Sequence, residues 1–144
     1  MRILIAEDNE CFRLLLTVAL HDHRVMIAKD GAEAVALAEC HQPDVILMDV
    51  MMPEVDGFEA LRQLKADEAT ADIPVILMSA GCVRQQDIER GLKLGAEDYW
   101  KKPFSVLGLG KVLEGYVAKK KARAVTRTSP TTSPNPYHKI ERSV

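Results

Sequence analysis

Short apolar runs alternate along the chain with segments whose apolar residues recur at helical spacing. The runs are continuous rather than alternating in polarity, which is typical of strands covered on both faces of a parallel sheet. The expected strands are residues 3–6, the weaker 25–28, 45–48, 75–78 and, last, 96–100.

Apolar residues at positions i, i+3, i+4 and i+7 predict helices between these strands. The two clearest faces are Phe12, Leu15, Leu16 and Ala19, and Leu109, Val112, Leu113 and Tyr116. Further helices are expected around residues 32–40, 58–64 and 88–92, and Asp56-Gly57 is expected to form a turn and helix start. Strand then helix, five times over, predicts an α/β domain with helices on both faces and any site at the carboxyl ends of the strands.

The last predicted helix contains Gly108, Gly110 and Gly115. Each glycine inside a helix costs up to about 1 kcal/mol relative to alanine. We therefore expect this helix to depend on tertiary packing.

Length and charge divide the 144-residue chain into a body and a tail. Residues 1–118 hold twelve Lys and Arg against twenty Asp and Glu, whereas residues 119–144 hold seven basic residues and only one acidic residue. The last 25 residues are also rich in Ser, Thr and Pro. We expect one domain over residues 1–119 and a flexible basic tail over residues 120–144.

Cysteine spacing and hydropathy exclude several classes of protein. Cys11, Cys40 and Cys82 form no CxxC pair, so neither a disulfide framework nor a thiolate zinc site is indicated. We expect these cysteines to be small residues of the core. His21 and His23 are expected in a solvated loop. No apolar stretch approaches the roughly 18 residues of a spanning helix, so a cytoplasmic protein is expected.

Side chains that can take part in a reaction, together with one proline, follow four of the five predicted strands. They are Glu7, Asp8, Asp49, Ser79, Lys102 and Pro103. Three carboxylates gathered at one sheet edge repel one another unless a cation is present, and Mg²⁺ prefers oxygen ligands. A strand-end Asp can attack a phosphoryl group, while Mg²⁺ and a lysine ammonium neutralise the phosphoryl oxygens. The pattern indicates a magnesium-dependent phosphoryl-acceptor site.

Five segments, in this order, resemble the response-regulator receiver domain of two-component signalling. They are residues 3–9 (ILIAEDN), 49–59 (DVMMPEVDGFE), 74–80 (PVILMSA), 95–99 (GAEDY) and 102–104 (KPF). The resemblance implies a flavodoxin-like, doubly wound five-stranded parallel sheet in the order 2-1-3-4-5.

The same resemblance assigns roles to individual residues. Asp49 is implied as the phosphoacceptor, and Glu7, Asp8, Asp49 and the backbone carbonyl of Met51 as the Mg²⁺ ligands. Ser79, Tyr99 and Lys102 are implied as phosphoryl-stabilising and switch residues, with Pro103 structural at the site. Glu7 stands where the family more commonly has Asp, which leaves open whether its carboxylate reaches the metal directly or through water.

The implied function is a phosphorylation switch. A histidine kinase or histidine phosphotransfer protein would supply the phosphoryl group, and an unknown downstream protein would read the result. No DNA-binding domain is recognised, a homodimer stays open, and no enzyme activity is expected beyond Mg²⁺-dependent phosphorylation and dephosphorylation of the chain itself.

Three alternatives remain at this point. The chain could be the receiver part of a larger regulator whose output domain is absent. It could be a haloacid-dehalogenase-type phosphatase, although that class needs a second Asp where Met51 stands. It could also be an interaction module that works without phosphorylation.

Overall fold

The computed structural model describes residues 1–126, in which five strands alternate with five helices. The strands are β1 (Arg2–Ala6), β2 (Arg24–Ala28), β3 (Val45–Asp49), β4 (Val75–Ser79) and β5 (Asp98–Lys101). The helices are α1 (Glu10–Ala19), α2 (Gly31–His41), α3 (Gly57–Ala66), α4 (Gln85–Lys93) and α5 (Leu109–Thr126). The predicted alternation is confirmed.

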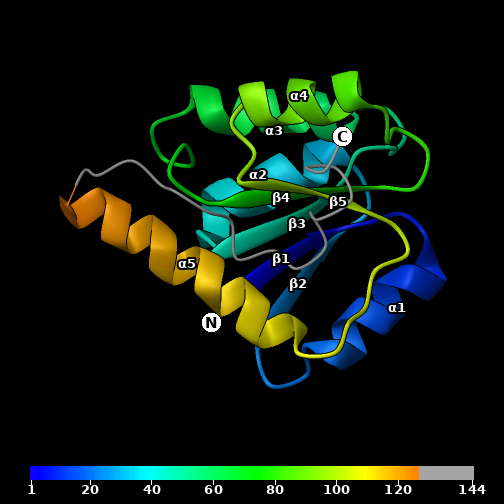
Figure 1. Ribbon diagram of the computed structural model, residues 1–144, viewed down its shortest axis with the longest axis horizontal. Helices are drawn as coiled ribbons and strands as arrows, with labels where there is room; N and C mark the ends of the chain where they lie inside the picture. Colours follow the sequence, from blue (N-terminus) through cyan, green and yellow to red (C-terminus); the bar gives the residue numbers. More distant parts are fainter. Residues whose placement is uncertain (127–144) are drawn as a thin grey trace.

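All neighbouring strands pair in parallel, in the order β2-β1-β3-β4-β5. Figure 1 shows α1 and α5 on one face of this sheet and α2, α3 and α4 on the other. The sheet is therefore doubly wound, and the carboxyl ends of all five strands meet at one edge. This is the flavodoxin-like order that the resemblance implies.

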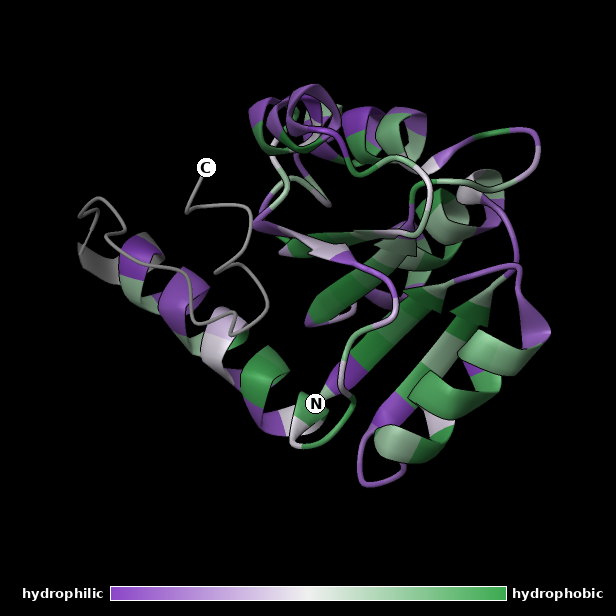
Figure 2. Ribbon diagram, turned by 45° about the vertical axis from the view of Figure 1, so that its right-hand side comes forward, coloured by the Kyte–Doolittle hydropathy of each residue, from purple (hydrophilic) through white to green (hydrophobic). Residues whose placement is uncertain are grey.

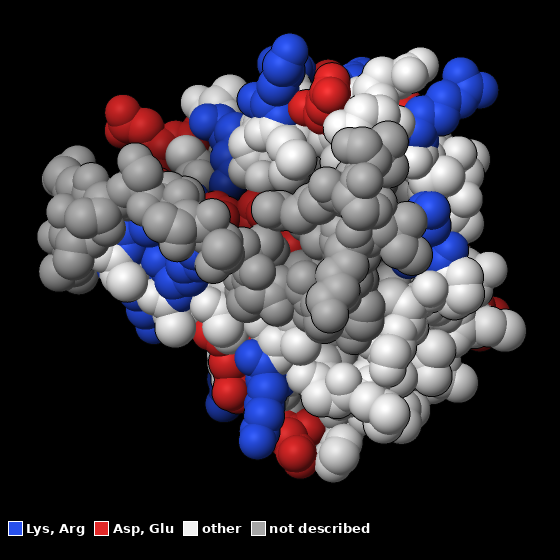
Figure 3. All heavy atoms as spheres, in the orientation of Figure 1, with Lys and Arg blue, Asp and Glu red and all other residues white. Residues whose placement is uncertain are grey.

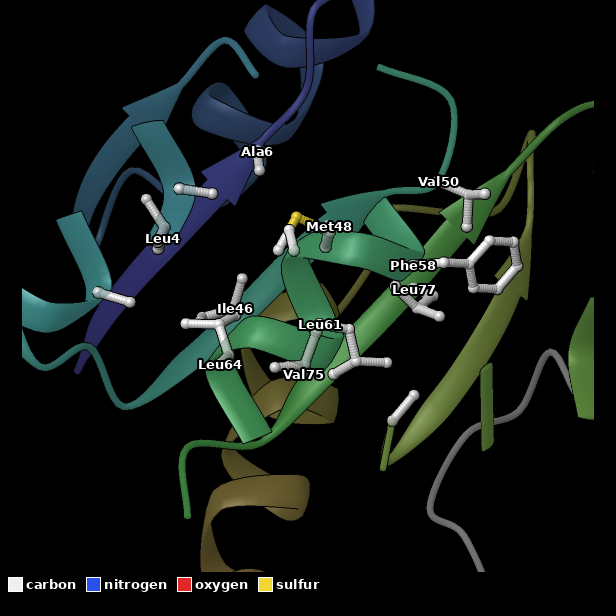
Figure 4. Close-up of a cluster of buried hydrophobic side chains, with 14 of the residues drawn as sticks. Leu4, Ala6, Ile46, Met48, Val50, Phe58, Leu61, Leu64, Val75 and Leu77 are labelled. Atoms are coloured by element: carbon white, nitrogen blue, oxygen red, sulfur yellow. The ribbon is translucent and has the colours of Figure 1, made fainter. Parts of the chain in front are cut away.

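Two apolar clusters hold the helices to the sheet. One lies between the sheet and α2, α3 and α4, where Leu61 and Leu64 pack against strand residues such as Ile46 and Val75 (Figure 4). The other joins the sheet to α1 and α5 and contains Trp100. Every residue of β3 and β4 is buried, which explains their continuous apolar runs, visible as the hydrophobic centre of Figure 2.

Side-chain caps fix where three of the helices begin. Asn9, Asp30 and Asp56 each accept a hydrogen bond from the backbone N–H three residues ahead. After Asp56, Gly57 donates its N–H to the carbonyl of Val50, and a Cβ there would lie 2.4 Å from the carbonyl oxygen of Asp49. The predicted Asp56-Gly57 turn and helix start is confirmed, and it packs α3 against the end of β3.

Some predicted core residues are exposed instead. Leu15 is 46% exposed, because α1 turns only a narrow stripe around Leu16 toward the sheet. Cys11 and Cys40 lie on the outer sides of α1 and α2, so their prediction as core residues is wrong. Cys82 is half-buried and packs against the first cluster.

Two further predictions need correction near the start of α5. Gly108 precedes the helix with a φ of 69°, a left-handed conformation that favours glycine, so it is not a helical residue. His23 lies in a loop as predicted, but its side chain is only 15% exposed, because its ring lies between the amino group of Met1, 3.3 Å away, and Glu114. Gly110 permits this approach, because a Cβ there would lie 2.9 Å from His23 Nε2.

The predicted boundary between domain and tail, at residues 119 and 120, falls inside α5. Most of the predicted tail, residues 127–144, lies outside the described residues. Within residues 1–126, none of the helices combines the length and the apolar character that crossing a membrane requires.

Candidate functional site

Three carboxylates gather at the carboxyl edge of the sheet. Glu7 and Asp8 directly follow β1, and Asp49 ends the neighbouring β3. One oxygen from each of the three lies within 4.8 Å of the others. Glu7 is fully buried, Asp49 is nearly so, and Asp8 is exposed, so the cluster opens to solvent on the Asp8 side.

Lys102 brings a cation to these carboxylates from the loop after β5. Its Nζ lies 2.7 Å from Glu7 Oε1 and 3.3 Å from Asp49 Oδ2. The backbone N–H of Lys102 donates to the carbonyl of Ser79, and the Lys102-Pro103 peptide bond is cis. The ammonium also lies 4.7 Å from the ring centroid of Phe12 on α1. Its neighbour Lys101 is exposed and takes no part in this arrangement.

The protein raises the pKa of Asp49 to about 7. Burial of the carboxyl group is the main cause, and the negative charge of Glu7 adds to it. Lys102 acts in the opposite direction but does not outweigh them. A second cation at the cluster would therefore favour the ionised, nucleophilic form of Asp49.

The donor set suits a hard divalent cation. Carboxylate oxygens are the ligands that Mg²⁺ takes from proteins, usually one or two of them together with water and phosphate oxygens. Met51 lies at the same edge, where its N–H donates to Asp49 Oδ1 at 3.3 Å and its side chain is 55% exposed. The residues present thus fit Mg²⁺.

Ser79 and Tyr99 meet at the same backbone segment, the loop after β4. The buried Ser79 Oγ accepts a hydrogen bond of 2.8 Å from the N–H of Cys82, and the Tyr99 hydroxyl donates to the Cys82 carbonyl. Tyr99 is buried, and this burial raises the pKa of its hydroxyl. One peptide segment is therefore held by both side chains.

Two contacts at the site were not identified from the sequence. The N–H of Asn9 donates to Glu7 Oε2 at 3.1 Å, and Arg13 of α1 donates to the carbonyl of Glu7 at 3.1 Å. Asn9 carries a recognisable helix N-cap signal, but no local pattern links Arg13 to the backbone of Glu7. Both contacts orient the chain where β1 passes into α1.

Two proteins resemble this chain over most of its length. Protein PilH of Pseudomonas aeruginosa is 39% identical over 121 residues, which cover 81% of this chain and 98% of PilH. The DNA-binding dual master transcriptional regulator RpaA of Synechocystis is 43% identical over 107 residues, 73% of this chain and 44% of RpaA. The chain thus spans less than half the length of the second relative.

Two solved structures are similar to this chain in both fold and sequence. The receiver domain of a sensor histidine kinase from Pseudomonas aeruginosa, with magnesium coordinated in its active-site cleft, has a TM-score of 0.73 and 34% identity over 81% of this chain and 97% of that one. Chemotaxis protein CheY4 of Vibrio cholerae has a TM-score of 0.71 and 28% identity, over 79% of this chain and 96% of its own. The family model of the response regulator receiver domain matches residues 3–114, and the chain belongs to this family of two-component signalling domains.

Proposed function

We propose that this receiver domain takes a phosphoryl group onto Asp49 from a phosphohistidine and signals through protein contacts that depend on the modification. The observation that carries the proposal is the position of Asp49. Its carboxylate ends β3 within 4.8 Å of the Glu7 and Asp8 carboxylates and 3.3 Å from the Lys102 ammonium. A nucleophile, candidate metal ligands and a fixed cation thus share one sheet edge.

In the proposed reaction, a carboxylate oxygen of Asp49 attacks the phosphorus of the phosphohistidine. The new O–P bond forms as the P–N bond breaks, and the departing imidazole leaves with its electron pair and takes a proton. Lys102 stabilises the negative charge on the phosphoryl oxygens. Glu7, Asp8, Asp49 and the Met51 carbonyl would hold Mg²⁺, which supplies further charge neutralisation when bound.

The surface beside the site suits a protein as phosphodonor. Three large apolar side chains of α1 are exposed, namely Leu14 (63%), Leu15 (46%) and Val18 (61%). Leu107, in the loop before α5, is 86% exposed. Figure 3 shows few charged side chains over α1. We propose that a helical histidine kinase or histidine phosphotransfer protein docks on this face, which would place both proteins in the cytoplasm.

The output of the domain is a separate question. Because the chain covers only part of longer relatives such as RpaA, a receiver piece of a larger regulator is the second candidate. For the chain as it stands, we propose that residues 1–119 act as the switch and that a downstream protein, or a second copy, reads it.

A phosphatase acting on external esters has no support at the site. The position two residues after Asp49 is Met51, which offers a thioether instead of a carboxylic acid to protonate a leaving group. Members of the receiver family are generally signalling domains without enzyme activity. We therefore propose that catalysis is limited to phosphorylation and dephosphorylation of Asp49 itself.

Intact-mass measurement tests the proposal directly. Incubation with acetyl phosphate and Mg²⁺ should add one phosphoryl group, which hydroxylamine should remove because an acyl phosphate is a mixed anhydride. Asp49→Asn should not be labelled, whereas Asp56→Asn, which changes a carboxylate at the start of α3, should be. Equal labelling of the Asp49→Asn protein would disprove the assignment.

A further inference from the structure

β2 is an edge strand, and its outer side has backbone groups available for pairing. The N–H of Arg24 donates to the carbonyl of Met1, and the carbonyl of Ala28 accepts from Glu7, so these groups face β1. Backbone groups of alternate residues in a strand point to opposite sides. The N–H and C=O groups of Val25 and Ile27 therefore point away from β1, where no other strand of residues 1–126 lies.

Grooves lie along both faces of this edge. On the α2 side, a groove of about 540 Å³ is lined by β2 together with Leu37 and His41 of α2 and Arg2 of β1. On the α1 side, a smaller groove of about 190 Å³ lies between Ile27 and four residues of α1, the charged Glu10 and Arg13 together with Leu14 and Thr17. An added strand would find space for its side chains above and below the sheet.

The larger groove is cationic with an apolar floor. Arg2, Arg24 and His41 are exposed around it, Met26 and Leu37 are half-buried in it, and no acidic residue lines it in the described part of the chain. Arg2 already donates to the carbonyl of Gln42, but Arg24 forms no ion pair within residues 1–126. The guanidinium of Arg24 is thus open to a carboxylate.

We propose that the outer edge of β2 binds an extended acidic segment of a partner protein, which adds a sixth strand to the sheet. Main-chain hydrogen bonds to Val25 and Ile27 would hold its backbone. Its side chains alternate in direction, so glutamate or aspartate would enter the groove beside Arg24 and His41 while apolar residues face Ile27 and Leu14. A stretch of about five residues matches the length of β2.

The observations favour such a segment over a second copy of this chain. A second copy would present the same cationic groove and would bring its own α1 and α2 against these helices. A single extended segment places only side chains in the two grooves and supplies the missing negative charge. The larger groove contains none of the residues of the Asp49 cluster, so the proposal does not depend on phosphorylation.

Fluorescence anisotropy tests the proposal with a labelled peptide, Thr-Glu-Val-Glu-Val-Glu-Thr, and a second peptide with lysine at each glutamate position. The wild-type chain should bind the glutamate peptide, and Arg24→Glu should weaken that binding about tenfold or more. Lys111→Glu, the same charge change at an exposed position of α5, should bind like the wild type. Asp49→Asn should also bind normally.

Amide hydrogen exchange supplies the second readout. The peptide should slow exchange at Val25 and Ile27 and leave Met26, whose N–H faces β1, nearly unchanged. Absence of binding at millimolar peptide, equal binding by the Arg24→Glu protein, or tighter binding of the lysine peptide would each overturn the proposal. So would self-association of the chain that the Arg24→Glu substitution abolishes, because the edge would then serve a second copy.

Discussion

The Lys102 ammonium lies closer to Glu7 than to Asp49, with distances of 2.7 Å and 3.3 Å to the respective carboxylate oxygens. The Glu7 side chain has no exposed surface, and that of Lys102 is 14% exposed. Lys102 therefore balances a buried charge in addition to the role in phosphoryl transfer proposed above. Loss of one partner leaves an uncompensated charge in the interior.

Lys102→Met should consequently destabilise the Mg²⁺-free protein by about 3 kcal/mol, the cost of breaking a buried ion pair. Lys101→Met, an identical substitution one position earlier at an exposed side chain, should change the free energy of unfolding by less than about 0.5 kcal/mol. Urea denaturation of the two variants measures the difference. Equal stability of both would show that Glu7 does not depend on Lys102 for charge balance.

Asp49→Asn should stabilise the Mg²⁺-free protein at neutral and alkaline pH. The pKa of Asp49 is raised from 3.8 to about 7, so the folded state binds its proton more tightly than the unfolded state. This group therefore lowers the stability progressively as the pH rises from about 4 to about 7. One unit of pKa shift corresponds to about 1.4 kcal/mol, so at pH 8 a gain of at least that size is expected for the variant.

The pH dependence distinguishes this cause from a general effect of the substitution. The gain should shrink as the pH falls from 7 toward 5, where the folded protein already holds the proton. Thermal unfolding of both proteins across this range measures it. A gain that stays constant with pH would contradict the raised pKa of Asp49.

Mg²⁺ should raise the melting temperature of the wild-type protein. A ligand that binds only the folded state adds RT ln(1 + [L]/Kd) to the free energy of unfolding, about 2.7 kcal/mol at a concentration of 100 Kd. Asp8→Ala should remove most of this response, because Asp8 is the exposed member of the cluster and lies where the site opens to solvent. Asp22→Ala, at an exposed loop carboxylate, serves as control. An equal response of the Asp8→Ala protein would place the Mg²⁺ site elsewhere.

Much of the fold could be predicted from local patterns. The buried runs of β3 and β4 are continuous because both faces are covered, and the caps at Asn9, Asp30 and Asp56 have ordinary side chains at ordinary positions. The strand order came from the family resemblance, because spacing along the chain does not determine which strands become neighbours. Burial on α1 was harder to predict, because Leu15 and Leu16 are both apolar and only packing decides which faces the sheet.

The candidate site could likewise be predicted only in part. Strand-end positions brought Glu7, Asp8, Asp49 and Lys102 together, since parallel strands end at one edge. The pairing of Lys102 with Glu7 could not be predicted, because it depends on the length of two side chains and on the path of the loop after β5. The exposure of Cys40 likewise depends on which face of α2 meets the sheet.

The position of Cys82 between Ser79 and Tyr99 leads to a prediction about transmission. Ser79 Oγ accepts from the Cys82 N–H, and the Tyr99 hydroxyl donates to the Cys82 carbonyl. If the Ser79 hydroxyl turns to donate to a phosphoryl group on Asp49, Ser79 Oγ no longer lies where it accepts from the Cys82 N–H. The loop after β4 can then move. Tyr99, bonded to the same loop, would then move with it.

Ser79→Ala should therefore still be phosphorylated on Asp49 but should lose most of the phosphorylation-induced change in amide chemical shifts along residues 84–116. Tyr99→Phe, which keeps the ring and removes only the hydroxyl, should show the same loss in this region because the loop and β5 are no longer joined through Cys82. Ser105→Ala, a hydroxyl deletion in the loop before α5, should keep the full response. Heteronuclear NMR of the phosphorylated proteins measures these changes residue by residue. A full wild-type pattern in the Ser79→Ala protein would remove the hydroxyl from the pathway and leave the Lys102-Pro103 segment, bonded to the Ser79 carbonyl, to carry the signal.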